Sequence, residues 1–200
     1  KCIMKAGIFS IGLDTYWPQF DGLLGNLNGY HAEIRDRIAG MGIELVDAGM
    51  VDSVEKAGGA ASLFRREEVE VIFLFISTYA LSSTVLRVVQ KANVPVVMLN
   101  IQPVAQLDYE KFNALGDRGV MTGIWLEHCQ SCSVPELACV FNRTGIDYHV
   151  VTGYLQEEAA WKEIEDWVDA AKVMAGISEN RVGVLGHYYC GMLDVYSDMT

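Results

Sequence analysis

The segment after the first predicted strand carries side chains suited to binding a polyol. Asp14 and Thr15 have oxygens that can hydrogen-bond to hydroxyl groups. Tyr16 and Trp17 follow them directly and offer flat apolar faces with polar edges. Open α/β sheets build their ligand sites in loops of this kind, at the carboxyl ends of strands. The combination suits a sugar, and the alternative is that Trp17 only packs the start of the next helix.

A second polar and aromatic cluster follows the last predicted strand, over residues 186–194. It contains His187, Tyr189 and Met192. An isolated histidine is more often structural than catalytic, but this one lies in the densest polar-aromatic cluster of the chain. A ligand-binding role and a structural role therefore both stay open for His187.

The spacing Cys129-x-x-Cys132, with His128 just before it, could indicate metal binding or redox chemistry. A structural zinc site normally adds a second pair of ligands, which the chain does not provide. A thioredoxin-type pair would follow the first strand of its domain, not the fourth. We expect instead a polar loop over residues 130–135 that leads into a helix beginning at Pro135. The chain has five cysteines, an odd number, and we expect reduced thiols.

Hydroxyl side chains also gather over residues 77–84, directly after the most apolar strand. They could bind a ligand there, or cap the next helix, which is the commoner role of serine and threonine at such a place. The connection over residues 100–119 is longer than most links between a strand and a helix, and such loops are often functional. Gln102 and Asp117 could face a ligand or a neighbouring subunit.

Charge and hydropathy exclude several classes of protein. A net charge of −11 argues against binding to a nucleic-acid backbone. The longest apolar run, residues 69–76, is far too short to cross a bilayer, and no signal-peptide pattern is visible. The glycine-rich fingerprints of dinucleotide and P-loop sites are absent. We expect a cytoplasmic protein with no nucleic-acid or membrane partner.

Apolar runs alternate with helical periodicities along the chain. Strands are predicted over residues 6–11, 42–46, 71–76, 94–99, 146–151 and 181–186. Helices are predicted over residues 20–39, 54–66, 81–92, 120–128, 135–143 and 157–174. This alternation predicts an α/β fold with three layers and a doubly wound, largely parallel sheet of flavodoxin-like or Rossmann-like type. The expected strand order is 2-1-3-4-5.

The last predicted strand has no helix or partner strand after it. Residues 172–181 hold a glycine, a serine and an asparagine between a helix and a new strand, and form the expected domain boundary. We expect residues 1–177 to form an N-terminal parallel α/β domain. Residues 178–200 would then be the start of a truncated second α/β domain, represented by its first strand.

Four segments in a fixed order carry a resemblance to a known family. They are residues 8–17, 130–153, 156–161 and 184–194. Together they resemble the N-terminal part of the L-arabinose isomerase and L-fucose isomerase superfamily. The resemblance runs over essentially the whole chain, and it implies the first of three domains in a subunit more than twice as long.

The resemblance implies interconversion of an aldose and a ketose through an enediol, on a pentose or deoxyhexose such as L-arabinose or L-fucose. It also implies Mn²⁺ or another divalent metal in the full-length protein, with a carboxylate pair that moves the proton between C1 and C2. The metal ligands belong to the family's later domains. This chain alone is therefore expected to bind no metal and to be inactive. The implied partners are a monosaccharide and further copies of the chain, as a trimer, tetramer or hexamer.

The same resemblance implies that loops of this chain line the substrate site of the oligomer without supplying a catalytic residue. The residues implied to bind substrate are Asp14, Thr15, Tyr16, Trp17, Gln130, Ser133, His187, Tyr189 and Met192. The arabinose isomerases carry Ser-Gln-His-Leu-Tyr in the first loop, from which this chain departs at nearly every position. Ser133 stands about where those enzymes have a histidine.

Two other functions stay open. A non-catalytic sugar-binding α/β module, such as a sensor or half of a periplasmic-type binding protein, would look similar at this length. A flavodoxin-like electron carrier would need a phosphate-binding loop after the first strand, and the bulky Trp17 opposes one.

Overall fold

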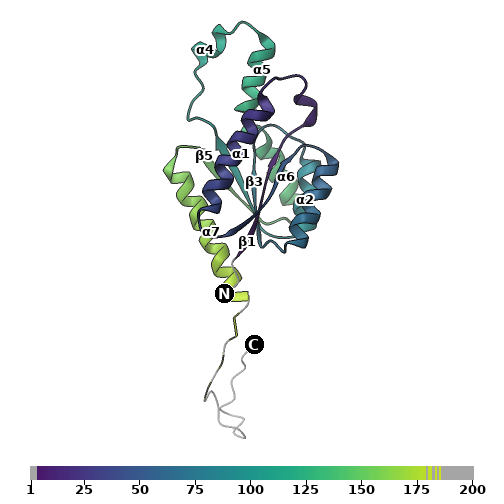
Figure 1. Ribbon diagram of the computed structural model, residues 1–200, viewed down its shortest axis with the longest axis vertical. Helices are drawn as coiled ribbons and strands as arrows, with labels where there is room; N and C mark the ends of the chain where they lie inside the picture. Colours follow the sequence, from purple (N-terminus) through teal and green to yellow (C-terminus); the bar gives the residue numbers. More distant parts are fainter. Residues whose placement is uncertain (1–3, 179, 182, 184, 186–200) are drawn as a thin grey trace.

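The computed structural model describes residues 4–178, 180, 181, 183 and 185. In this part of the chain, parallel strands form one sheet in the order β2-β1-β3-β4-β5 (Figure 1). The strands are β1 (Lys5–Ile11), β2 (Glu44–Val51), β3 (Val71–Phe75), β4 (Val96–Gln102) and β5 (Tyr148–Tyr154). The predicted α/β fold, its parallel sheet and the strand order 2-1-3-4-5 are confirmed.

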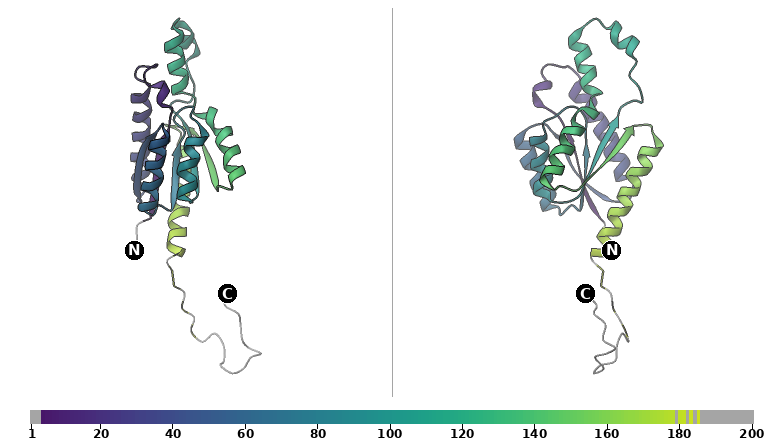
Figure 2. Two further views of the ribbon diagram at one scale, coloured as in Figure 1. Left: turned by 90° about the vertical axis from the view of Figure 1, so that its right-hand side faces the viewer. Right: turned by 180° about the vertical axis from the view of Figure 1, so that it is seen from behind.

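Helices cover both faces of the sheet, which gives three layers (Figure 2). The covering helices are α1 (Leu23–Ala39), α2 (Val54–Arg66), α3 (Ser82–Ala92), α6 (Gln130–Thr144) and α7 (Glu158–Ser178). One apolar core lies under α1 and α7, where Ile34 and Ile164 are fully buried. The other lies under α2, α3 and α6 and includes Phe64 and Phe141.

The central strand β3 is buried along its whole length. Phe73 and Phe75 point into the first core, and Ile72 and Leu74 point into the second. A strand that is apolar on both faces is what a parallel sheet covered by helices requires. Removing such side chains from water contributes about 25 cal/mol per Å² of apolar surface, and this burial is the main force that assembles the layers.

Several boundaries differ from those predicted. β2 continues to Val51, whereas the prediction ended it at residue 46, because a bulge at Gly49 allows pairing with β1 to resume. β4 and β5 likewise pair with each other as far as Gln102 and Tyr154, past the apolar runs that guided the prediction.

The connection over residues 100–119 contains a short helix, α4 (Tyr109–Ala114), that the prediction missed. It is followed by α5 (Arg118–Glu127), which begins where the carboxylate of Asp117 accepts hydrogen bonds from the backbone N–H groups of Gly119 and Val120. Both helices extend beyond the carboxyl ends of the strands (Figure 1). Because α5 also packs against α1, it forms a wall beside the loops at this edge of the sheet.

Of the predicted sixth strand, residues 181–186, positions 182, 184 and 186 lie outside the described residues. The same holds for most of the predicted second domain, residues 178–200, and for all of His187, Tyr189 and Met192.

Gly153 in β5 lies directly against α7. A Cβ atom at this position would lie 2.5 Å from the Cβ of Ala160 and 2.5 Å from a carboxylate oxygen of Glu157. Gly153→Ala should therefore lower the free energy of unfolding by about 1–3 kcal/mol, as overpacking does in cores. Urea denaturation measures this change. Gly58→Ala is the control, because an added Cβ there meets nothing within 4 Å inside α2, and it should be neutral or stabilising by up to about 1 kcal/mol.

Candidate functional site

The candidate site lies where the carboxyl ends of β1 and β3 meet. The connection after β1 leads to β2 on one side, whereas the connection after β3 leads to β4 on the other, and open α/β sheets bind ligands at such switch points. The loop after β1 forms a short 3-10 turn, Asp14–Tyr16. Asp14 and Thr15 are exposed, and Tyr16 is half-buried. In this turn, Asp14 and Thr15 are therefore accessible to a ligand from solvent, and Tyr16 is accessible in part.

Trp17 holds this loop against the body of the domain. Its indole Nε1–H donates to Oδ2 of Asp52 over 2.9 Å, and that carboxylate, 3% exposed, also pairs with Nζ of Lys56 at 2.8 Å. A Cβ atom on Gly12 would lie 2.8 Å from the ring of Trp17, so the ring requires glycine there. The structure thus places Trp17 as a packing residue, which is the alternative drawn from the sequence.

The phenol of Tyr16 lies at the border between this packed layer and solvent. Its ring packs edge to face with Trp17 and Phe20, at centroid distances of 6.3 and 6.2 Å. Burial raises the pKa of Tyr16, and Tyr79 adds a smaller contribution in the same direction. The hydroxyl therefore stays protonated at neutral pH and can both donate and accept a hydrogen bond.

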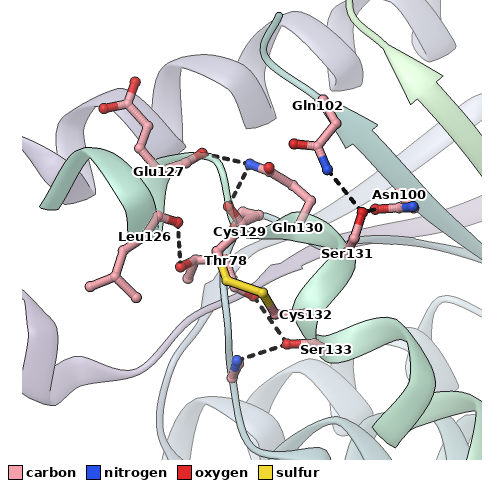
Figure 3. The surroundings of a disulfide bond; sticks show 12 residues. Thr78, Asn100, Gln102, Leu126, Glu127, Cys129, Gln130, Ser131, Cys132 and Ser133 are labelled. Atoms are coloured by element: carbon pink, nitrogen blue, oxygen red, sulfur yellow. Dashed lines mark hydrogen bonds between the residues drawn. A yellow bond between two sulfur atoms is a disulfide. The ribbon is translucent and has the colours of Figure 1, made fainter. Parts of the chain in front are cut away.

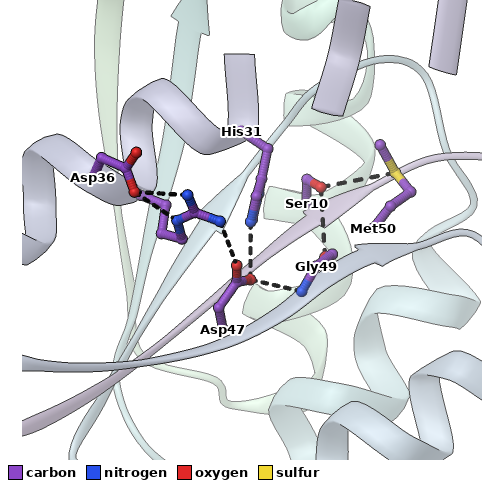
Figure 4. A network of polar contacts seen from close by, with 7 residues as sticks. Ser10, His31, Asp36, Asp47, Gly49 and Met50 are labelled. Carbon is purple, nitrogen blue, oxygen red and sulfur yellow. Dashed lines mark hydrogen bonds and ion pairs between the residues drawn. The ribbon is translucent and has the colours of Figure 1, made fainter. Parts of the chain in front are cut away.

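A bulge in β2 lies opposite the end of β1, next to a network of polar contacts (Figure 4). Gly49 takes a φ of 65°, and its N–H donates to Oδ1 of Asp47 over 2.7 Å. The same oxygen lies 2.9 Å from Nε2 of the buried His31 on α1. The extra residue turns Met50 towards the apolar cluster that contains Trp17. Bulges near sites commonly redirect a side chain in this way.

The pKa of Asp47 is set by opposing effects. Burial alone would raise it, but hydrogen bonds from His31, from the N–H of Gly49 and from Arg35 outweigh burial and hold the pKa below its usual value. The charged carboxylate is therefore the form that the folded protein favours.

The loop after β3 is fully buried at its beginning and bonds to three other segments. The hydroxyl of Ser77 donates to the carbonyl of Ile11 at the end of β1. Thr78 Oγ1 donates to the carbonyl of Leu126 in α5 over 2.7 Å. The hydroxyls at this end of the loop are therefore occupied within the fold, whereas Tyr79 is half-buried.

Gln130 and Ser133, which the family resemblance places near substrate, also bond to this loop (Figure 3). Gln130 Nε2 donates to the carbonyl of Ser77 over 3.0 Å, and the N–H of Ala80 donates to Ser133 Oγ over 3.1 Å. Both side chains are completely buried. Among the described residues, Oε1 of Gln130 has no hydrogen-bond partner. The structure brings the two residues to the edge of the sheet that carries Asp14, but beneath its surface.

The expected loop over residues 130–135 is wrong, because α6 begins at Gln130 and contains Pro135 inside its second turn. The expectation of reduced thiols is also wrong for two cysteines. Cys129 and Cys132 form a disulfide at the start of α6. Cys139 is free and exposed, and the other two cysteines lie outside the described residues.

A row of polar side chains crosses the ends of β4 and β5 beside the disulfide. Gln102 Nε2 donates to Ser131 Oγ over 3.1 Å, which in turn donates to Oδ1 of Asn100 over 3.2 Å. Asn100 Nδ2 then donates to Thr152 Oγ1 over 3.2 Å. Sequence reasoning noted Gln102 but missed the others. The signal was present, because polar residues interrupt the ends of both strands after apolar runs.

A cleft of about 430 Å³ separates the start of α1 from α5. Its lining includes Gln19 and Phe20 from the loop after β1, and Asp117 and Glu127 from the region of α5. Glu127 is fixed by a hydrogen bond from Nδ2 of Asn26 at 3.0 Å and by another from the hydroxyl of Tyr30.

The pKa of Tyr30 is raised, mainly by burial and then by its hydrogen bond to Glu127. The lining of the cleft thus includes a carboxylate, Glu127, that Asn26 and the phenol of Tyr30 hold in place.

The described residues do not fit the divalent metal that the resemblance implies. They contain no group of three or more histidine, cysteine, aspartate or glutamate side chains placed to hold an ion.

Comparison with known proteins adds little. No protein-family model matches the chain, and no curated protein matches it. A putative acylhydrolase from Bacteroides fragilis has a similar structure, with 8% sequence identity over 85% of this chain and 87% of that one, at a TM-score of 0.41. A likeness this distant supports no conclusion about activity. Over the described residues, no helix combines the length and apolar character that crossing a membrane requires.

Replacing Trp17 by phenylalanine tests its role in packing the loop. Trp17→Phe keeps an aromatic ring but removes the donor to the buried carboxylate of Asp52, so the free energy of unfolding should fall by about 1–3 kcal/mol. Chemical denaturation measures the change. The matched control is Trp125→Phe on α5, where the side chain is exposed and the expected change is below about 0.5 kcal/mol. Equal effects at both positions would contradict the assigned role.

Replacing Asp47 by asparagine tests the bulge through its pH dependence. Because the folded pKa is depressed, the carboxylate stabilises the protein above its unfolded pKa of about 3.9, and this contribution is lost as the pH falls through the folded value. Asp47→Asn should therefore cost about 1–3 kcal/mol at pH 7. The difference from the wild type should shrink as the pH approaches 3, in denaturation curves recorded at each pH. Asp147→Asn, at an exposed carboxylate, is the control, and a constant difference down to pH 3 would refute the assignment.

Proposed function

We propose that this chain forms one wall of the sugar site of an aldose–ketose isomerase acting on a pentose or deoxyhexose. The observation that carries the proposal is the turn after β1, which holds exposed Asp14 and Thr15 beside the half-buried phenol of Tyr16 at the switch point of the sheet. Sugar sites need hydroxyl partners arranged next to an aromatic surface, and this turn supplies both.

The turn is suited to orienting a substrate. Trp17 and the backbone N–H of Asp14 both donate to Asp52, which holds the turn in place, so that the side chains of Asp14 and Thr15 need little ordering when a ligand arrives. A carboxylate accepts hydrogen bonds from sugar hydroxyls more strongly than a neutral group does. Tyr16, kept protonated by its raised pKa, can bond to a ring or chain oxygen without taking a proton from it.

The adjoining cleft has a suitable size but is open on one side. Its volume of about 430 Å³ lies within the usual range of small-ligand sites, about 300–1,000 Å³. A ligand in it would contact the loop after β1 and α5, and the remaining contacts would come from another subunit or domain. This fits the homo-oligomer and the additional domains that the family resemblance implies.

The proton transfer and the metal lie outside the proposed role of this chain. The described residues contain no group of three or more potential metal ligands, so the proposed role of this chain includes no metal-dependent step. What these residues would do is bind the sugar, orient it and cover one side of it. A cytoplasmic location belongs to the same proposal and rests on the acidic composition and the sequence pattern described above.

The experiment compares variants of the full-length polypeptide in an assay of aldose–ketose interconversion with Mn²⁺ present. The substrates are a panel of aldopentoses and 6-deoxyaldohexoses. Asp14→Ala and Thr15→Ala should each lower kcat/KM for the best substrate about 10- to 100-fold, because each removes a hydrogen bond to the sugar.

The matched controls are Asp147→Ala and Thr144→Ala, which remove the same exposed residue types at the opposite edge of the sheet. They should leave kcat/KM unchanged. Unchanged kinetics in the Asp14 and Thr15 variants would rule out this wall of the site. Sugar binding seen by calorimetry without any interconversion would instead support the non-catalytic binding module.

A further inference from the structure

The disulfide between Cys129 and Cys132 has two unequal ends. Cys129 is 3% exposed and occupies the position just before the first turn of α6. Cys132, in that first turn, is exposed to solvent. Figure 3 shows the bond next to Gln130 and Ser133, the residues that hold the loop after β3. Cys129 is therefore shielded from solvent by the fold, whereas Cys132 is accessible to it.

This bond is poorly placed to act as a structural staple. It joins residues only three positions apart, and a disulfide restrains the unfolded chain least when the loop that it closes is short. The domain also has two extensive apolar cores that do not depend on it. A cross-link that adds so little to the fold is better explained by its chemistry.

We propose that Cys129 and Cys132 form a thiol–disulfide exchange site whose reductant is a small thiol of the glutathione type. This inference does not rest on the proposed function. The thiolate of the reductant attacks Sγ of Cys132, the bond between the two cysteine sulfurs breaks, and Cys129 leaves as a thiolate. A second thiol then attacks the mixed disulfide, releases Cys132, and leaves as the oxidised disulfide of the reductant. Two electrons and two protons enter the protein in all.

The start of α6 favours this direction of attack. The leaving sulfur of Cys129 sits at the N-terminus of a 15-residue helix, where the oxidised protein shows no side-chain hydrogen bond to the first turn. A thiolate released there lies at the positive end of the helix dipole, which stabilises its charge. Helix N-termini lower cysteine pKa values in this way, which makes Cys129 the better leaving group.

Reduction of the disulfide should also loosen the loop after β3. Gln130 lies between the two cysteines and Ser133 directly follows the second, and their side chains bond to the backbone of Ser77 and Ala80. Freeing the two sulfurs lets the first turn of α6 relax, so that these hydrogen bonds lose part of their support. Backbone N–H groups in this loop should then exchange with solvent faster in the reduced protein than in the oxidised one.

The first experiment equilibrates the folded protein in buffers that run from oxidised to reduced glutathione. Free thiols are then counted by maleimide labelling and mass spectrometry. With the other three cysteines replaced by serine, the protein should gain two labels across the series, and the further change Cys129→Ser/Cys132→Ser should leave none to gain. Hydrogen exchange of residues 77–80, measured on the same samples, should rise with reduction only in the protein that retains Cys129 and Cys132.

The second experiment tests which sulfur is attacked, in proteins whose other three cysteines are serine. With oxidised glutathione, Cys129→Ser leaves the exposed Cys132, which should form a mixed disulfide with one glutathione. Cys132→Ser leaves the buried Cys129, which should react more than about tenfold more slowly. Circular dichroism confirms that both variants are folded.

Three results would overturn the proposal. The first is a disulfide that gains labels only after denaturation, which would make it structural. The second is a pair of thiols that stays reduced even in oxidised glutathione. The third is faster modification of Cys129 than of Cys132, which would reverse the assigned direction of attack.

Discussion

The loop that leaves β3 is the constraint on which the carboxyl edge of the sheet depends. Its first residues, Ser77 and Thr78, are fully buried, so water cannot satisfy their polar groups, and an unpaired buried group costs about 1–3 kcal/mol. The partners come from the end of β1, from α5 and from the first turn of α6. Apolar packing brings these segments together, but the hydrogen bonds fix their orientation. One buried loop therefore sets the relative positions of the residues around the candidate site.

This arrangement divides the polar side chains of the edge into two layers. The inner layer, which includes Ser77, Thr78 and Ser133, is committed to the backbone and unavailable to a ligand. The outer layer is exposed and includes Asp14 and Thr15. A sequence motif does not reveal which layer a hydroxyl belongs to, because both roles use the same residue types. For that reason the sugar proposal rests on the turn after β1 and gives Gln130 and Ser133 no contact of their own with the substrate.

The sequence predicted the fold class well, because strands that are apolar on both faces and alternate with helices require a parallel sheet covered on both sides. The order 2-1-3-4-5 was an analogy with five-stranded flavodoxin-like sheets, and the structure has this order. The sequence was insufficient for the start of α6. A proline inside the second turn was taken for the helix start, since proline is common at that position. The error about the cysteines follows from the same cause. Residues at i and i+3 of a helical turn face the same side. The Cα atoms of Cys129 and Cys132 lie 5.5 Å apart, a distance that allows a disulfide. A flexible loop would not have fixed that distance.

The candidate sugar wall and the disulfide share the segment that joins α5 to α6. Leu126 and Glu127 at its beginning bond to the loop after β3 and to α1, and Gln130 at its end bonds to the same loop. Any change in the covalent state of Cys129 therefore acts on a segment that also borders the cleft. The coupling is local, because every link is a direct hydrogen bond or a shared turn of helix, and no distant conformational change is needed. Reduction of the disulfide should therefore change backbone hydrogen exchange most in the loop after β3 and less in the residues around the cleft. It should change least in the two apolar cores, which lie deeper between the layers.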